Sequence, residues 1–302
     1  MKTKKRINYR REKNGYFFIA PYFICFGLFS LYPILYTLSL SFVEWDGFTQ
    51  KVPVGLANYQ RLLADEVFWR SIGTTLLIAL ISTSLQMTFG LLLAFLLNQR
   101  WIRGSEIFKT VYYFPNLVTA VSLEVLFSLL FDWQSGGANK ILLALKILEE
   151  PYNWKGSAFW SRVIVILIIF WQYFGYYTII FTAGIKGISS ELLEAASIDG
   201  ASGGKIFFKI VLPLLRPIIV FACVTSIIGG LQIFDIPYTF GGVEGNPGKA
   251  LFTMSMFMFR TTFKNNNFGY GAAISQGIFI IIVVFSFAFM KVITGRGEET
   301  RD

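Results

Sequence analysis

The stretch IGTTLLIALISTSLQMTFGLLLAFLL, Ile72–Leu97, carries no charged residue. A helix needs about 20 mostly apolar residues to cross the hydrocarbon core of a bilayer, so this stretch is long enough to span it. Five other stretches have a similar composition and sufficient length: Tyr16–Phe42, Val111–Phe131, Val163–Thr182, Ile218–Ile236 and Ala272–Ile293. The sequence therefore predicts an all-α fold, that of a polytopic membrane protein with six transmembrane helices.

The composition agrees with this fold class and excludes several functions. Hydrophobic residues make up 54% of the 302 residues and charged residues 15%, whereas a soluble domain averages about 25% charged residues. The chain contains no His, which removes His metal ligands and His general bases. Cys25 and Cys223 both lie in apolar runs without a Cys-x-x-Cys pair, so we predict no metal site and no redox role.

The distribution of charge predicts the orientation. The net charge is +9, and with six spans 17 basic residues fall on the side of the termini against 10 on the other side. Because cytoplasmic loops carry the excess of Lys and Arg, both termini are predicted to be cytoplasmic. Residues 1–15 then form a basic tail rather than a nucleic-acid-binding arm, residues 16–293 one transmembrane domain, and residues 294–302 a second tail. The apolar segment Ala250–Phe263 is short for a span, so we expect an interfacial or re-entrant helix.

The segment SSELLEAASIDGASGGKIFFKIVLPLLRP, Ser189–Pro217, lies on the predicted cytoplasmic side. Ser190 is expected to cap a first helix that ends at Gly200, and a second helix is expected from about Ala201 to Leu212. Small side chains on the first helix would let a partner approach closely, while Glu194 and Asp199 would offer charges to its Arg or Lys. A cytosolic motor could dock here, and an amphipathic interfacial loop without a partner is the alternative.

A motif within this segment resembles the EAA loop of the permease subunits of bacterial ATP-binding-cassette (ABC) importers. The matching residues are Glu194-Ala195-Ala196, Gly200, Ile210 and Leu212-Pro213. Other segments are similar to the binding-protein-dependent carbohydrate permeases, in particular Tyr32–Tyr36, Gly55–Tyr59, Phe234–Tyr238 and Phe268–Ala273. The resemblance covers roughly Tyr16 to Ile293. Gly203 and Gly204 depart from it, because such permeases usually carry bulkier or polar residues there.

The resemblance implies a type I importer permease fold and a defined assembly. Such a permease pairs with a second, homologous permease on two ATPase subunits, and an extracytoplasmic solute-binding protein delivers the sugar. It lies in the bacterial inner or plasma membrane, in contact with lipid and not with nucleic acid. The ATPases bind ATP and Mg, so no cofactor is expected in this chain. Glu194 matches the residue that contacts an ATPase Arg in the family. The expected coupling residues are Glu194, Ala195, Ala196, Asp199, Gly200, Leu212 and Pro213.

Polar and aromatic side chains inside the spans are candidates for the substrate path, because sugars stack on aromatic rings and bond to amides. The candidates are Asn116, Glu124, Gln172, Tyr173, Tyr176, Gln232 and Asp235. Interfacial Tyr belts and Gln bonds between helices are the structural alternative. For Glu124, two further explanations stay open: pairing with the partner permease, or a position near the aqueous end of the helix.

Apart from Lys291 near the end of the last span, the predicted spans contain no Lys or Arg. An anionic substrate would need a cation, so a neutral oligosaccharide is favoured over glycerol phosphate. A polyol, which is also neutral, stays open as an alternative substrate. The chain is not expected to be an enzyme. The stretch from Gly242 to Ala250 lacks both the spacing and the Ser or Thr of an ATP-binding P-loop. A membrane enzyme would need a cluster of catalytic or metal-binding groups, which the predicted outer loops lack.

Overall fold

The computed structural model describes residues 9–99 and 102–295. Most of the two predicted tails, residues 1–8 and 296–302, lies outside the described residues. Apart from one pair of two-residue strands, the regular secondary structure of the described residues is helical. In this part of the chain, five helical segments are long and apolar enough to cross a membrane, and a bent pair of helices counts as a sixth. The predicted all-α class is therefore confirmed.

Among the described residues, 9–64 and 261–277 form one of two units. Its N-terminal span runs through α1 (Tyr9–Phe26), a π-helical turn (Gly27–Leu31) and α2 (Tyr32–Leu40). The unit also contains β1 (Val43–Glu44), β2 (Val52–Pro53), α3 (Ala57–Ala64) and the first part of α15 (Phe268–Gly295). Tyr9, the first described residue, is already helical, so helical residues of the predicted tail precede the first span.

Side-chain hydrogen bonds fix α3 beside the end of α2. The buried amide of Asn58 donates to the carbonyl oxygens of Ser41 and Val43, each at 3.0 Å. The hydroxyls of Ser41 and Tyr59 lie 2.6 Å apart. These two carbonyl groups follow the end of α2. Because Asn58 supplies a hydrogen-bond donor to both, it stabilises the turn that follows the first span.

The turn between β1 and β2 is built on Asp46. Its carboxylate accepts hydrogen bonds from the backbone N–H groups of Thr49 at 2.8 Å and Phe48 at 2.9 Å. These bonds favour the charged carboxylate and lower the pKa of Asp46 to about 2. The turn therefore keeps its Asx geometry over the whole neutral and mildly acidic range.

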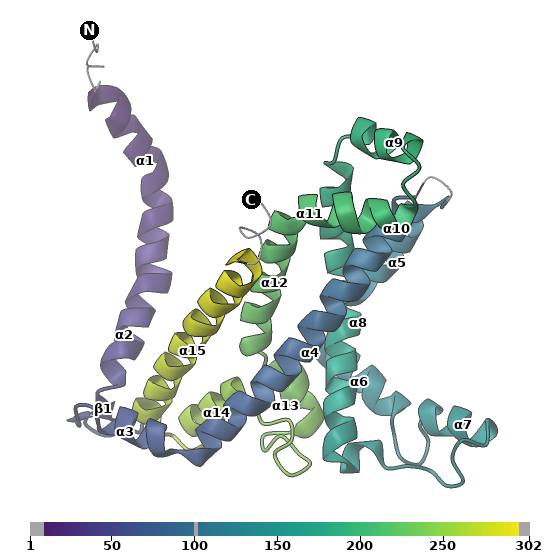
Figure 1. Cartoon of the computed structure of the whole chain (residues 1–302). Coiled ribbons are helices and arrows are strands. Elements are labelled where there is room, and N and C mark those ends of the chain that lie inside the picture. The colour runs from purple at the N-terminus through teal and green to yellow at the C-terminus, as the bar shows by residue number, and fades with distance from the viewer. Residues whose placement is uncertain (1–8, 100–101, 296–302) are drawn as a thin grey trace. The chain divides into compact units, whose positions relative to one another are not determined.

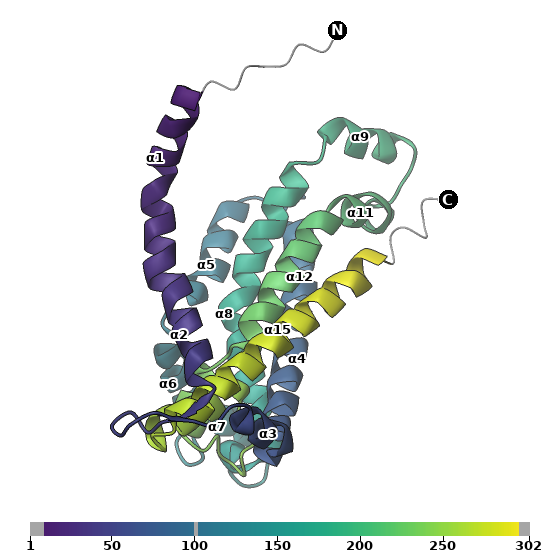
Figure 2. The ribbon, with the colours of Figure 1, turned by 90° about the vertical axis from the view of Figure 1, so that its left-hand side faces the viewer.

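The described residues 65–99, 102–260 and 278–295 form the second unit. Its helices are α4 (Glu66–Leu97), α5 (Ser105–Leu117), α6 (Ala120–Leu130), α7 (Gly137–Ala144), α8 (Ala158–Lys186), α9 (Ser190–Ile198), α10 (Gly203–Ile206), α11 (Leu212–Leu214), α12 (Arg216–Leu231), α13 (Asp235–Gly241), α14 (Met254–Phe259) and the rest of α15. Within this unit, α9 and α11 lie at one end and α6 and α7 at the other (Figures 1 and 2).

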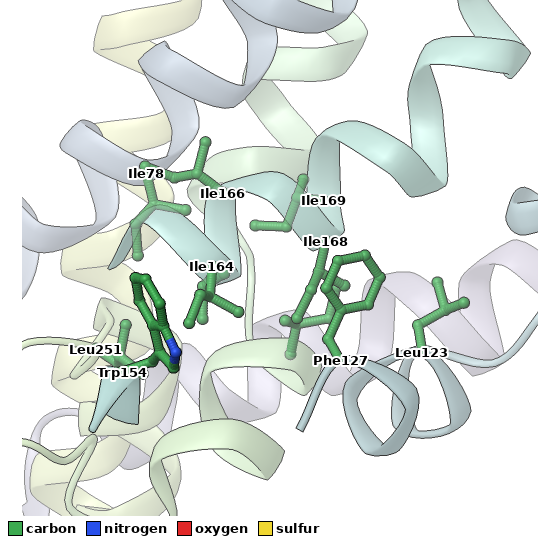
Figure 3. Packing of buried hydrophobic residues seen from close by; sticks show 11 residues of the cluster. Ile78, Leu123, Phe127, Trp154, Ile164, Ile166, Ile168, Ile169 and Leu251 are labelled. Carbon is green, nitrogen blue, oxygen red and sulfur yellow. The ribbon is translucent and has the colours of Figure 1, made fainter. Parts of the chain in front are cut away.

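Two apolar clusters hold the second unit together. The first joins α4, α6 and α8 through buried residues such as Ile78, Leu123 and Ile168 (Figure 3). The second joins α4, α8 and α12 and includes Phe181 and Leu215. Each cluster brings together residues from segments far apart in the sequence, so burial of apolar surface fixes the helix arrangement.

Tight helix crossings depend on glycine in the second unit. A Cβ at Gly175 of α8 would collide with the backbone of Tyr112 on α5, and a Cβ at Gly230 of α12 would lie 2.9 Å from the Cβ of Ala79 on α4. The absence of a side chain allows the helix backbones to approach at these two points.

The predicted span Val111–Phe131 is not one continuous helix. The segment is split into α5 and α6, which meet at an angle of 98°. The connecting residues Val118 and Thr119 are extended, and the Thr119 hydroxyl accepts a hydrogen bond from the N–H of Ser122 at 3.2 Å. This N-cap starts a new helix inside an apolar run, where the hydropathy pattern alone gives no signal.

The other predicted spans agree with the structure to within a few residues. Asp65 caps α4, since its carboxylate accepts a hydrogen bond from the N–H of Val67 at 2.9 Å, and the helix therefore starts before the apolar run. The segment Ala250–Phe263 contains α14 and most of the π-helical turn Arg260–Lys264, and neither is long enough to span a membrane. The expectation of a short helix there is confirmed.

Candidate functional site

The segment Ser189–Pro217 forms two short helical stretches at one end of the second unit, as α9 and α10–α11 show in Figures 1 and 2. The prediction that Ser190 caps the first helix is wrong. Ser189 occupies the N-cap position without a side-chain hydrogen bond, and Ser190 is the first helical residue. Glu191 lies in the first turn, where its negative charge interacts favourably with the positive end of the helix dipole.

Gly200 ends the first helix, as predicted. Its φ is +79°, in the left-handed region that glycine adopts without strain. The N–H of Gly200 donates to the carbonyl of Ser197 at 3.1 Å, and the N–H of Ala201 donates to that of Ala196 at 3.0 Å. These two bonds form a Schellman motif, which satisfies the last carbonyl groups and turns the chain.

The second helical stretch begins at Gly203, two residues later than predicted. Ser202 accepts a hydrogen bond from the N–H of Lys205, and the stretch continues through α10, the π-helical turn Phe207–Val211 and α11. Phe207 and Val211 are buried, and the Phe207 ring centroid lies 4.7 Å from that of Phe95 on α4. The second stretch is therefore anchored to the helix bundle.

Most predicted coupling residues are accessible at this end of the unit. Glu194, Ala195, Asp199, Gly200 and Pro213 are exposed, while Ala196 and Leu212 are half-buried. A nearby ion pair joins α8 to α5: the Lys186 ammonium lies 3.5 Å from the Glu106 carboxylate, which also binds Lys109 at 2.7 Å. Because Lys186 lies just before the segment that leads to α9, this contact joins the base of α9 to α5.

A cavity of about 290 Å³ lies among the helices of the second unit. It is lined from α4, α6, α8, α12, α13 and residues 232–234, and it brings together the predicted residues Gln172, Tyr173, Gln232 and Asp235. Asn116, Glu124 and Tyr176 do not line it. Four of the seven predicted substrate-path residues therefore share one polar cavity, and the lining contains no Lys or Arg.

The cavity has further polar residues that the sequence reasoning missed: Ser82, Gln86, Thr225 and Ser226. Three of its helices are joined by a buried chain of hydrogen bonds. The Ser226 hydroxyl lies 2.8 Å from that of Thr83 and donates to the Gln86 amide oxygen at 3.0 Å, while the Gln86 amide nitrogen donates to the Ile169 carbonyl at 3.3 Å. The small hydroxyl residues that recur at helical spacing in α4 and α12 could have indicated these polar contacts between helices.

Glu124 has its polar partners within this chain. It is buried in α6, bonds to the Ser128 hydroxyl, and lies 4.0 Å from the Lys155 ammonium. Lys155 also donates to Ser128 at 2.6 Å and lies over the Phe240 ring at 4.6 Å. This cluster compensates a buried carboxylate with a cation and a hydroxyl, a structural role for Glu124.

Comparisons with known proteins identify the family. Residues 86–296 match the family described as binding-protein-dependent transport system inner membrane component. The lactose transport system permease protein LacF of Rhizobium radiobacter is 34% identical over 95% of this chain and 97% of its own. The trehalose/maltose transport system permease protein MalF of Thermococcus litoralis is 31% identical over 95% of this chain and 96% of its own.

A solved structure has the same fold. A chain of a bacterial alginate ABC transporter, crystallised with a periplasmic protein that holds an alginate pentasaccharide, superposes with a TM-score of 0.79 at 22% identity. The match covers 95% of this chain and 96% of that one. The resemblance to type I ABC importer permeases is confirmed, and the chain is a transport protein rather than an enzyme. It belongs to the binding-protein-dependent transport system inner membrane component family.

Proposed function

We propose that this chain is one of two permeases in an ATP-driven importer that carries a neutral oligosaccharide into the cytoplasm. The observation that carries this proposal is the cavity of about 290 Å³ lined by the amides of Gln86, Gln172 and Gln232 and by Tyr173 and Tyr177. Amides can bond to hydroxyl groups, and aromatic rings can lie against the faces of sugar rings. Such a lining suits a ligand with many hydroxyls.

The charge of the cavity favours a neutral ligand. Asp235 contributes a carboxylate to the lining, and no Lys or Arg balances it. An anionic substrate such as glycerol phosphate would meet this carboxylate without a compensating cation. The names of relatives agree with saccharide transport, since they refer to lactose, trehalose and maltose, and arabinooligosaccharides. The cavity is small for an oligosaccharide, so a second permease would supply the rest of the path.

Transport requires that the cavity be coupled to ATP hydrolysis. In this proposal, two ATPase subunits bind ATP and Mg and dock against α9, where Glu194 meets an ATPase Arg. Ala195 and the half-buried Ala196 leave space for close approach. Phe207, in the helical stretch that follows α9, packs in the apolar cluster that α8 and α12 share. In this proposal, movement of α9 is therefore transmitted through α8 and α12 to the cavity.

The orientation follows the predicted charge distribution. Both termini and α9 then face the cytoplasm, and α6, α7 and the start of α8 face outward. A solute-binding protein would deliver the saccharide to the outward end. The chain itself would bind neither ATP nor a cofactor, because the ATPases supply that chemistry.

Uptake measurements test the proposed substrate class. A strain lacking this chain and its parent are offered labelled neutral mono- and oligosaccharides, a polyol and glycerol phosphate. We expect selective loss of uptake of one neutral saccharide, with recovery when the chain is restored. Selective loss of glycerol phosphate or of the polyol would contradict the neutral saccharide and leave the transporter class intact.

A further inference from the structure

A second cavity of about 360 Å³ opens beside the start of α4, within the second unit. It is lined by α4, by Arg162 near the start of α8, and by the loop residues Gly248, Lys249 and Phe252. None of the residues that line the polar cavity of about 290 Å³ lines this one. The two cavities are therefore distinct, and they differ in charge.

Three cations from three segments meet in this second cavity: Arg70, Arg162 and Lys249. Among the described residues, neither Arg162 nor Lys249 has a carboxylate within 4.0 Å. Arg70 pairs with Glu66 at 3.1 Å, but both side chains are more than 80% exposed, so water screens the pair. The cavity therefore carries an excess of positive charge.

The backbone positions two of these cations. The Arg162 Nε donates to the carbonyl of Ala250 at 2.9 Å, which orients the guanidinium and leaves its terminal N–H groups available. Lys249 has a φ of +62°, in the left-handed region that residues with a side chain rarely adopt. Such backbone strain persists where the surrounding structure holds it, often at a binding site.

Aromatic side chains mark the depth of these cations in a membrane. Trp69 precedes Arg70 and is 53% exposed, and Phe159 and Trp160 precede Arg162 and are 65% and 36% exposed. Exposed Trp residues gather where the hydrocarbon core meets the headgroups. The two Trp residues beside the cations fit a position at headgroup depth.

Below the cations, the same face of α4 becomes apolar. Arg70, Thr74, Leu77 and Ile81 follow one another at the spacing of a single helix face, and Leu77 and Ile81 are 38% and 44% exposed. Eleven residues of helix cover roughly 16 Å at about 1.5 Å per residue. This length is close to half of the roughly 30 Å hydrocarbon core, which is the depth of one leaflet.

We propose that this groove binds an anionic phospholipid, with the phosphate between Arg162 and Lys249 and an acyl chain along Leu77 and Ile81. Arg70 contributes charge at the rim. The phosphate accepts hydrogen bonds from the guanidinium and ammonium groups, and the apolar face covers the chain. The site lies in the leaflet where α4 begins; calling that leaflet the outer one rests on the proposed orientation.

Lipid retention tests the site without any transport measurement. The chain, purified with its partner subunits, is placed in nanodiscs of phosphatidylglycerol and phosphatidylcholine in equal amounts. Native mass spectrometry then counts the lipids that stay bound after the nanodisc is released. We expect the native chain to retain phosphatidylglycerol selectively. In the double variant Arg162→Gln, Lys249→Gln, we expect retention to fall about fivefold for each charge removed, or roughly 25-fold in all.

Two further variants separate the site from general charge and folding effects. Lys140→Gln with Lys146→Gln removes the same charge from the exposed α7 region and should keep the lipid. Gly73→Leu keeps all charges but fills the groove, and a Cβ there meets nothing within 4 Å, so the fold should survive. Retention of phosphatidylglycerol by Gly73→Leu should fall as it does in the double variant.

Two results would overturn the proposal: equal retention of the two lipids by the native chain, or unchanged retention in the Arg162 and Lys249 double variant. If that double variant keeps its lipid but no longer binds a solute-binding protein or the second permease, the groove is a protein contact instead. A failed sugar assignment would leave lipid retention unchanged, so the two proposals fail separately.

Discussion

The coupling helices and the polar cavity differ in how the chain builds them. The coupling helices come from one continuous segment, Ser189–Pro217, whose caps and glycine turn are local. The cavity is lined from five helices that span residues 82–236. A local element keeps its shape when a side chain changes, whereas an assembled cavity depends on every crossing around it. We therefore expect substitutions near the cavity to affect folding and those in α9 to affect coupling.

The largest effect is expected at a crossing that supports the cavity. Gly175→Leu places a side chain against the backbone of Tyr112 on α5, which cannot move without separating α5 from α8. We expect a loss of more than about 4 kcal/mol in stability and little folded protein. The measurement is thermal unfolding in detergent, monitored by size-exclusion chromatography. Gly73→Leu on α4 is the matched control and should unfold no earlier than the native chain, because a Cβ there meets nothing within 4 Å and leucine favours a helix. A normal midpoint for Gly175→Leu would contradict the packing account.

A smaller loss is expected in the buried hydrogen-bond chain. Ser226→Ala removes the hydroxyl that donates to Gln86 and leaves the Gln86 amide oxygen without that donor. An unsatisfied buried polar group costs about 1–3 kcal/mol. Thermal unfolding should show this loss, whereas Ser84→Ala on the exposed face of α4 should change little. Equal midpoints for the two variants would mean that the chain of hydrogen bonds does not hold the cavity helices.

The cavity itself should determine substrate affinity. Gln172→Ala and Tyr173→Phe remove groups that line it, and Tyr176→Phe removes a hydroxyl from the same helix outside it. For Gln172→Ala we expect about a tenfold rise in the KM of uptake, the equivalent of one hydrogen bond. Tyr173→Phe should give a smaller rise, and Tyr176→Phe should match the native chain. A larger effect for Tyr176→Phe than for Tyr173→Phe would place the substrate elsewhere.

The smallest effect on stability is expected in the proposed coupling helices. Gly203→Ala should stabilise α10 by about 1 kcal/mol, because a Cβ there meets nothing within 4 Å and alanine favours a helix. Gly200→Ala should weaken the turn instead, because its φ is +79°. Hydrogen exchange of the amides in residues 200–214 would show slower exchange for the first variant and faster exchange for the second. A change of the exchange rate in the same direction for both variants would contradict the described turn.

The sequence predicted the elements that depend on local pattern. Apolar length identified the spans, and the glycine at position 200 marked the end of α9, because both signals lie within a few neighbouring residues. The bend at Thr119 was missed, since a single N-cap inside an apolar run leaves the hydropathy unchanged. The cap at Ser189 was missed because two adjacent serines are equivalent as cap candidates.

The cavity was only partly predictable for a different reason. Tyr173 and Tyr176 are both aromatic residues of α8, and only the packing of α4, α6 and α12 decides that Tyr173 lines the cavity. Glu124 was a candidate because a charge in a span is costly, but Lys155 from a distant loop compensates it. Such pairings depend on tertiary contacts that no local pattern encodes.

Coupled transport by the reconstituted importer tests the central claim, that ATP hydrolysis drives import through α9, most directly. Glu194→Lys reverses the charge at the proposed ATPase contact, and Glu191→Lys reverses a charge one turn earlier on the same helix. We predict that Glu194→Lys abolishes saccharide uptake and its stimulation of ATP hydrolysis while the chain folds normally, and that Glu191→Lys keeps most of both. Normal uptake with Glu194→Lys, in an importer that still assembles, would contradict the account.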